Sequence, residues 1–236
     1  MTTDIDRMAR PAPLQRVAPS GCRSAARPAE NLCSVAAGQY IYEAGQPGAA
    51  LFILASGRVH LRQRAATGVM LVTDLLRPGA LFGLDSLSTG RHAESALAVR
   101  TCLVRSVPLA LMDRLLARQP GFAAGLMEAM LRRRATAERL LGRAVVAGVQ
   151  GRLAGALLDS ADDGVVAGLT RQQLAEAAWT ARETATRALY HLADQGLLQI
   201  DGRCIRLHDP ERLRQLAAGA RHASGKQKEE RVGSEW

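Results

Sequence analysis

Apolar residues recur with a helical period in the C-terminal half of the chain. Counted at about 100° per residue, Leu189 lies about 40° and Leu192 about 20° from Ala185. This narrow apolar stripe predicts an amphipathic helix with one buried side. A shorter helical run precedes it, where Thr170 and, three positions later, Gln173 fit a capping box.

Two short alternating runs follow the second helix. Gly196 stands where a left-handed residue would end that helix. The dipeptide Asp201-Gly202 then separates two alternating segments, which is a strong signal for a two-residue β-hairpin. Two closely joined helices followed by a hairpin predict a winged helix-turn-helix.

The pattern differs in the N-terminal half. Residues 35–107 alternate short strand-like runs with glycines, which predicts a small β-barrel or jelly roll. In 120–147, apolar residues recur at spacings of three and four when Arg133 is counted, as in a coiled-coil stripe; the alternative is a helix that packs only on its own barrel. The residues of this stripe are Leu126, Met130, Ala137, Leu140 and Ala144.

Composition narrows the setting. The 236 residues carry a formal net charge of +9, which suits a polyanionic partner but on charge alone fits a membrane surface equally well. No apolar run approaches the roughly 20 residues of a membrane span, and the first residues lack the layout of a secretion signal. Four cysteines without regular pairing fit a reducing compartment. We therefore expect a soluble, cytoplasmic protein that does not bind membranes.

The start of the second helix carries side chains that suit DNA bases. Glu183 and Arg187 lie opposite the apolar stripe, and Arg182 flanks that face in the first turn. Arg can fork onto the two acceptors of guanine, and Glu can accept from the amino group of cytosine. The alternative is a solvated, salt-bridged helix face, but the helix pair, the caps and the hairpin favour base contact. The rest of the expected interface with double-stranded DNA, most of it suited to holding phosphates, is Thr170, Arg171, Gln172, Thr180, Thr184 and Arg203.

The segment TRQQLAEAAWTARETATRAL resembles the helix-turn-helix signature of the Crp/Fnr family of bacterial transcription regulators. The resemblance implies that Arg182, Glu183 and Arg187 read bases. It also implies a homodimer on a palindromic site, with half-sites about one helical turn apart.

Two residues depart from the family signature. Trp179 stands where the family usually has the turn glycine, so it either reshapes the turn or packs as a core anchor. Ala181 stands where the family usually has a capping Ser or Thr. The lost hydroxyl costs about 1 kcal/mol of helix stability unless Thr180 takes over as the cap.

A second resemblance covers the N-terminal half. The segment GQYIYEAGQPGAALFILASGRVHL, followed by LRPGALFGLDSL, resembles the cyclic-nucleotide-binding fold of Crp/Fnr sensors, so that the likeness covers roughly 35–215. It implies an α+β chain with an N-terminal β-jelly-roll sensor domain, a long dimerisation helix and a C-terminal winged helix-turn-helix. The expected parts are a flexible basic arm at 1–34, the sensor barrel at 35–118, the dimerisation helix at 119–147, the DNA-binding domain at 148–216 and a disordered tail at 217–236.

The expected effector pocket departs from the cyclic AMP-binding pattern of the family. That pattern has a Gly-Glu-Leu turn for the ribose and an Arg-Ser pair for the phosphate, whereas Leu84 here cannot accept a hydroxyl. The Arg position is Glu94, or Ala93 when the alignment is anchored on Gly90, and neither supplies the positive charge that a buried phosphate needs. We therefore do not expect gating by cAMP in the usual way. The residues of the expected pocket are Leu84, Asp85, Ser86, Arg91, Glu94 and Ser95, with Arg91 as the only local cation.

The cysteines do not match the iron–sulfur branch of the family, which has a closely spaced N-terminal group. Cys22 and Cys33 are separated by ten residues, and a redox disulfide between them stays open as an alternative. Cys102 and Cys204 are expected to be small buried strand residues. No cofactor is predicted: neither an iron–sulfur cluster nor haem is expected, and no metal site is indicated.

Three functions compete. The first is a sequence-specific transcription regulator acting as a homodimer. The second is an effector- or redox-gated interaction protein whose helical domain does not read DNA sequence. The third, an enzyme, is not expected, because no catalytic grouping or phosphate loop supports it. The acidic loop 159–164 is either solvated or a contact for RNA polymerase.

Overall fold

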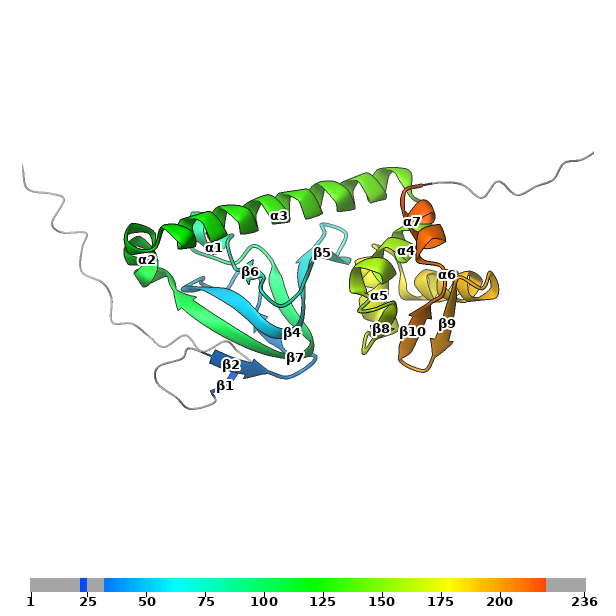
Figure 1. Ribbon diagram of the computed structural model, residues 1–236, viewed down its shortest axis with the longest axis horizontal. Helices are drawn as coiled ribbons and strands as arrows, with labels where there is room; N and C mark the ends of the chain where they lie inside the picture. Colours follow the sequence, from blue (N-terminus) through cyan, green and yellow to red (C-terminus); the bar gives the residue numbers. More distant parts are fainter. Residues whose placement is uncertain (1–21, 25–31, 220–236) are drawn as a thin grey trace, which may run out of the picture. The chain divides into compact units, whose positions relative to one another are not determined.

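The computed structural model describes residues 22–24, there for the backbone alone, and 32–219 (Figure 1). Most of the expected basic arm at 1–34 and of the expected tail at 217–236 lies outside this part of the chain. The chain divides into two compact units, Met1–Glu138 and Arg139–Trp236. The division falls within a long helix, α3, rather than at either of its ends.

The first unit is built on an antiparallel sheet in the order β1-β2-β7-β4-β5, with β3 paired to β7 and β6 paired to β4. The alternating runs between 35 and 107 do form strands, although two of them are long. Its strands are β1 Cys22–Ser24, β2 Leu32–Val35, β3 Tyr40–Tyr42, β4 Ala50–Arg64, β5 Met70–Leu76, β6 Leu81–Phe82 and β7 Ser95–Pro108.

The two long strands, β4 and β7, bend through several register shifts. Gly57 stands at one of the shifts with a φ of 93°, where a Cβ would lie 2.4 Å from the carbonyl oxygen of Thr101. Only glycine fits such an approach at a positive φ. The bend lets both ends of the strands enclose one core, in which Ile41, Leu54 and Phe82 are fully buried.

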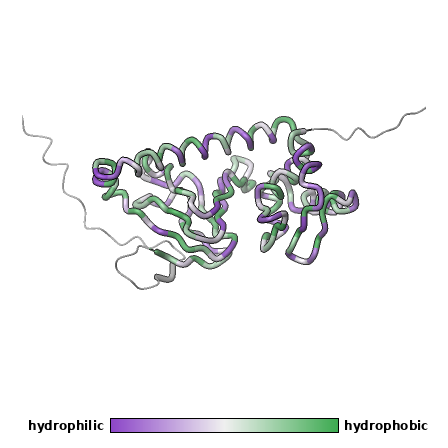
Figure 2. Tube along the Cα trace, viewed as in Figure 1, coloured by the Kyte–Doolittle hydropathy of each residue, from purple (hydrophilic) through white to green (hydrophobic). Residues whose placement is uncertain are grey.

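Helices complete the first unit and lead out of it: α1 Ser86–Thr89, the 3-10 turn η1 Leu109–Leu111, α2 Met112–Arg118 and α3 Pro120–Val146. Hydrophobic and hydrophilic residues alternate along α3 (Figure 2). Phe122, Leu126 and Ala129 on α3 pack against a small cluster of Leu51, Leu84 and Met112. The start of α3 is therefore fixed to the barrel by apolar contact.

The second unit holds the expected helix pair and hairpin. Leu153, Leu174 and Leu189 lie in its core, and its small sheet has the order β8-β10-β9. Strand β8 and helix α7 were not foreseen in the sequence; Asp209 caps α7 and a proline follows it. The elements are α4 Val149–Ser160, β8 Val165–Ala167, α5 Arg171–Ala177, α6 Arg182–Asp194, β9 Leu198–Asp201, β10 Cys204–Leu207 and α7 Pro210–Ala217.

The expected acidic loop begins later than the sequence suggested. Asp159 lies inside α4 and forms ion pairs with Arg139, at 2.5 Å, and with Arg143, both from α3. These pairs hold the end of α4 against the last turns of α3. Asp159 is thus a structural carboxylate, and Asp162 and Asp163 are the acidic residues left in the loop.

Candidate nucleic-acid interface and effector site

Helix α6 is set up by its own amphipathic pattern. Ala185, Leu189 and Leu192 are buried, as the stripe predicts. Glu183 and Arg187 are exposed on the other side, together with Arg182 at the start of the helix. No side-chain hydrogen bond or ion pair engages these three residues within the described part of the chain. Their donors and acceptors therefore remain available to a partner.

The start of α5 has the predicted capping box. The hydroxyl of Thr170 accepts from the backbone N–H of Gln173 at 3.1 Å, and the Gln173 side chain accepts from the Thr170 N–H at 2.8 Å. The start of α6 differs, because Ala181 is its N-cap and no side chain caps it. Thr180 thus does not replace the missing hydroxyl.

The turn between the two helices depends on Trp179. Its backbone is left-handed, with a φ of 52°, and its N–H donates to the carbonyl of Glu176 at 3.3 Å. A residue with a side chain adopts this conformation at a cost of about 1–2 kcal/mol, whereas glycine does so freely. The side chain of Trp179 is half-buried. Its backbone supplies the left-handed turn residue at a steric cost.

A hollow of about 470 Å³ lies between the start of α5, the start of α6 and the β9–β10 turn. Three guanidinium-bearing residues from three separate segments line it, namely Arg171, Arg182 and Arg203. Such a cationic hollow suits a backbone phosphate. Thr170 and Gln172 also line it, while Thr180 and Thr184 are half-buried and stand outside it.

Gly202 and Leu169 also line this hollow, although neither was predicted from the sequence as an interface residue. Gly202 has a φ of 55° in the Asp-Gly turn that was predicted, so the same turn signal could have placed its backbone at the interface. Leu169 carried no such signal.

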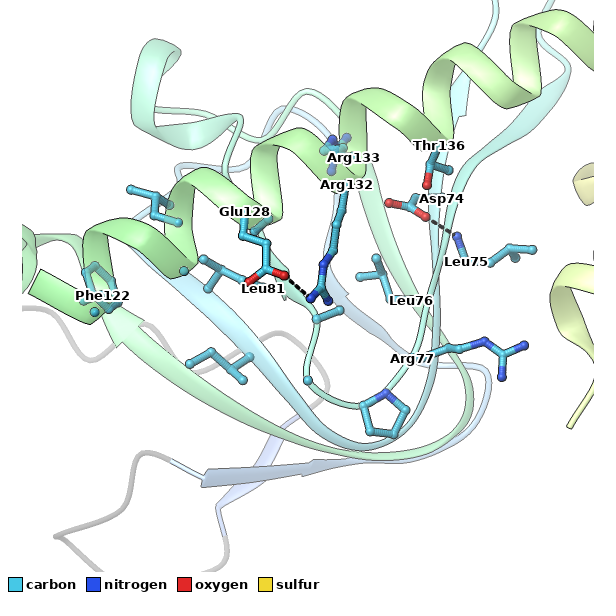
Figure 3. A pocket seen from close by; sticks show the side chains of 18 residues that line it. Asp74, Leu75, Leu76, Arg77, Leu81, Phe122, Glu128, Arg132, Arg133 and Thr136 are labelled. Atoms are coloured by element: carbon cyan, nitrogen blue, oxygen red, sulfur yellow. Dashed lines mark hydrogen bonds and ion pairs between the residues drawn. The ribbon is translucent and has the colours of Figure 1, made fainter.

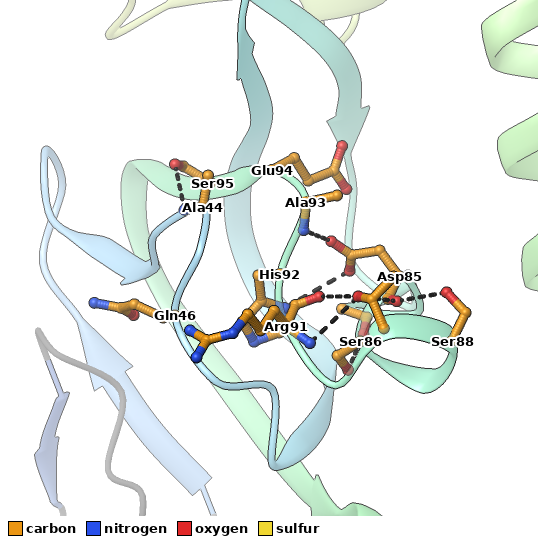
Figure 4. Close-up of polar contacts among 12 residues, drawn as sticks. Ala44, Gln46, Asp85, Ser86, Ser88, Arg91, His92, Ala93, Glu94 and Ser95 are labelled. Atoms are coloured by element: carbon orange, nitrogen blue, oxygen red, sulfur yellow. Dashed lines mark hydrogen bonds and ion pairs between the residues drawn. The ribbon is translucent and has the colours of Figure 1, made fainter.

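The polar side chains of the expected effector pocket are bonded to other groups of the same chain (Figure 4). Leu84 is buried in the apolar cluster beneath α3, and the hydroxyl of Ser86 donates to the carbonyl of Gly83 at 2.7 Å. The backbone N–H of Ala44 donates to the Ser95 hydroxyl at 2.9 Å. Arg91 is exposed and donates to the carbonyl of Gly45 at 2.7 Å, so this cation serves the surface backbone.

Asp85 accepts from the backbone N–H of Ala93. Its other oxygen lies 3.6 Å from Nδ1 of His92, within ion-pair range but beyond a hydrogen bond. Burial alone would raise the pKa of Asp85, but interaction with His92 and the Ala93 N–H lowers it overall. His92 in turn is buried against the ring of Tyr42, with ring centres 3.7 Å apart. These contacts fix the α1 turn.

Glu94 is the most deeply buried carboxylate of the expected pocket, at 4% exposure. One of its oxygens accepts from the guanidinium of Arg133 on α3, and the other accepts from the hydroxyl of Thr73 on β5 at 2.8 Å. Burial disfavours the charged form of Arg133, but the Glu94 charge raises the pKa of Arg133 overall. The position that lacks the expected positive charge thus holds a carboxylate that the chain's own Arg133 neutralises.

A groove of about 480 Å³ lies beside this pair, between α3 and the turn that joins β5 to β6 (Figure 3). Leu81, Phe122 and Leu126 form apolar lining. Arg132 of α3 also lines the groove and forms an ion pair with Glu128, one helical turn away (Figure 3). That pair is mostly exposed and contributes little to stability.

The cysteines are in two states. Cys33 is disulfide-bonded, and the side chain of Cys22, its expected partner, lies outside the described residues. Cys102 is free and buried, as expected, but Cys204 is free and exposed, because its side chain faces away from the core on β10. In the described residues, no group of three or more His, Cys, Asp or Glu is placed to hold a metal ion. Over the same residues, no helix is long and apolar enough to cross a membrane.

The fold and the exposed α6 face define a DNA-binding regulator whose winged helix-turn-helix follows a jelly-roll sensor domain. Residues 32–119 match the family model of the cyclic nucleotide-binding domain, and 151–216 match that of the Crp-like helix-turn-helix domain. The chain belongs to the Crp/Fnr family of transcription regulators. It is accordingly a sequence-specific DNA-binding transcription regulator of that type.

Similar proteins include the cyclic AMP receptor protein of Thermus thermophilus, 32% identical over 77% of this chain and 86% of that protein. A CRP-like cAMP-activated global transcriptional regulator of Mycobacterium tuberculosis is 27% identical over 76% of this chain and 85% of that protein. The solved structure of FixK2 from Bradyrhizobium japonicum superimposes with a TM-score of 0.70 at 25% identity, covering 79% of this chain and 96% of that one.

Proposed function

We propose that this regulator acts as a homodimer that reads a palindromic DNA site and does not require cAMP to do so. Arg182, Glu183 and Arg187 of each protomer contact base edges, while Arg171 and Arg203 hold phosphates. The free and exposed state of the three α6 side chains carries this proposal. The protein works in the cytoplasm and catalyses no reaction.

The dimer contact is proposed along α3, but on a stripe displaced from the one drawn from the sequence. Leu126 packs on its own barrel, and Leu140 and Ala144 are half-buried, whereas Met130 and Ala137 of the predicted stripe are exposed. Further large apolar side chains are exposed at Met127 (66%), Leu131 (60%), Leu141 (62%) and Val145 (77%). These four residues belong to one row with alternating spacings of three and four, which also contains one preceding residue, Ala124, and two intervening ones, Arg134 and Glu138.

Two members of this seam are charged, Arg134 and Glu138. They form an ion pair at 2.8 Å within their own helix. A polar layer in an apolar seam fixes register and partner number at some cost in stability. The homodimer is thus supported by an apolar seam that one charged layer interrupts.

Independence from cAMP is supported by the charges in the sensor domain. Glu94 occupies the place where a ligand phosphate would need a cation, and Arg91 is engaged at the surface. A cyclic nucleotide would have to bring its own negative charge beside Glu94 and Asp85. This chain is similar to proteins named for cAMP, and the charges of Glu94 and Asp85 support the proposal that it differs from them in this respect.

Selection from random duplex DNA tests the proposed function. We expect the wild-type protein, without added nucleotide, to enrich one palindrome, and the Arg187→Ala protein to lose that enrichment. An interaction protein that does not read sequence would enrich nothing. Contact with RNA polymerase, through Asp162 and Asp163 or elsewhere, is tested by adding the polymerase to the selected DNA complex.

A further inference from the structure

We propose that the interior of the sensor domain is an anion-binding site whose anion is the chain's own Glu94 carboxylate. The built-in carboxylate takes the part of a diffusible ligand and ties α3 to the barrel. Truncation of Glu94 therefore opens a site for a small monocarboxylate such as acetate. This inference goes beyond the proposed DNA reading, because its first test involves no DNA.

Three segments far apart in the sequence meet at this carboxylate. Glu94 directly precedes β7, Thr73 lies on β5, and Arg133 lies on α3. Both carboxylate oxygens are used, one by the guanidinium and the other by the Thr73 hydroxyl at 2.8 Å. A buried charge is stable only when it is paired and hydrogen-bonded in this way. The arrangement is that of an anion held in a prepared site.

The site is charge-balanced only while Glu94 is present. The Arg133 side chain is 31% exposed and points its charge at a carboxylate that is almost wholly enclosed. Replacing Glu94 by alanine would leave a cation and a hydroxyl facing the vacated volume of a carboxylate. Acetate has the size and charge of the missing group. Replacing Glu94 by glutamine would keep the volume filled and remove only the charge.

Hydrogen exchange of the α3 amides measures how firmly the Glu94–Arg133 pair ties this helix to the barrel. Loss of the pair frees α3 from β5 and from the start of β7, so its amides exchange hydrogen faster. We expect Glu94→Ala to accelerate exchange in 126–138 at least tenfold. Acetate at tens of millimolar should restore most of the protection, while chloride at equal ionic strength should not. Wild type and Glu94→Gln should show no response to acetate.

Glu128→Ala is the matched control. It removes a carboxylate from α3 that is also paired with an arginine, but in an exposed pair. Its exchange should not respond to acetate. A second variant, Arg133→Ala, vacates the cation instead, and low-millimolar guanidinium rather than acetate should restore its protection. This mirror variant also decides the matter if Glu94→Ala does not fold.

Specific DNA affinity gives an independent second readout. Glu94→Ala should bind the selected palindrome about tenfold more weakly, and acetate should restore this relative to chloride at equal ionic strength, because DNA binding depends on salt. The inference is overturned if acetate leaves exchange in Glu94→Ala unchanged, or acts equally on Glu128→Ala. It is also overturned if guanidinium fails on Arg133→Ala. Failure of DNA binding alone would count against the proposed function and leave the exchange result standing.

Discussion

The sensor domain and the DNA-binding domain use their charged residues in opposite ways. In the DNA-binding domain, Arg182, Glu183 and Arg187 are exposed and stand ready for a partner. In the sensor domain, Glu94 is buried and bonded to Arg133 and Thr73. The exposed side chains of α6 are available to DNA. In the sensor domain, the Arg133 cation is already paired with Glu94 and is therefore not available to a ligand anion. This difference is the basis for our proposal that the chain keeps the DNA-reading domain of the family and does not require cAMP.

The largest expected effect comes from breaking the proposed dimer contact on α3. Leu131→Glu places a charge in the proposed dimer contact but leaves the single protomer intact, because Leu131 is 60% exposed. We expect a monomer by light scattering and at least a thousandfold loss of affinity for the full palindrome. Leu87→Glu, on another exposed leucine, is the control. An unchanged dimer would refute the α3 seam.

The next effect separates base reading from phosphate holding. Arg187→Ala should cost about 1–3 kcal/mol per half-site and relax the choice of base there. Arg171→Ala should weaken binding to all sequences alike and lower the salt dependence. Competition titrations with the palindrome and with unrelated DNA measure both. If both variants lose affinity uniformly, the exposed charges of α6 do not read bases.

Acid should destabilise the sensor domain through His60. Burial, with Arg62 and Arg58 nearby, lowers the pKa of His60 to about 3. Between pH 6.5 and about 3, His60 is protonated in the unfolded chain but stays neutral in the folded chain. The free energy of unfolding therefore falls as the pH falls through this range. The loss at pH 5 amounts to about 2 kcal/mol. Denaturant unfolding of wild type and His60→Gln at pH 7 and pH 5 checks this; equal losses would show that His60 is not responsible.

The smallest effect concerns the uncapped start of α6. Ala181→Ser restores an N-cap oxygen where none exists, and it should stabilise the protein by about 1 kcal/mol. Thermal unfolding measures the gain, with Thr180→Ser as the control at the neighbouring position. No gain would mean that the missing hydroxyl is already compensated.

Much of the DNA-binding domain could be predicted from the sequence, because its signals are local. The capping box at Thr170, the stripe of Ala185 and the Asp201-Gly202 turn each arise within a few residues. The exposed face of α6 followed from the same period. The left-handed backbone of Trp179 did not follow, because nothing local marks a tryptophan for that conformation.

The sensor domain was predictable in class but not in its contacts. Glu94 could be placed against a ligand phosphate, yet Arg133 lies 39 positions away and joins it only through tertiary packing. On α3, Leu126 of the predicted stripe packs on the barrel, whereas Met130 and Ala137 are exposed. The sequence period cannot tell which side of an amphipathic helix a barrel will take, and here the barrel takes Leu126.

One titration tests most directly whether the winged helix-turn-helix binds its DNA site without cAMP. Fluorescence anisotropy of the labelled palindrome is followed with the wild-type protein, with and without saturating cAMP. We expect tight, sequence-specific binding with the same dissociation constant in both cases. A cAMP-dependent gain in affinity of tenfold or more would show that the protein is gated by cAMP after all.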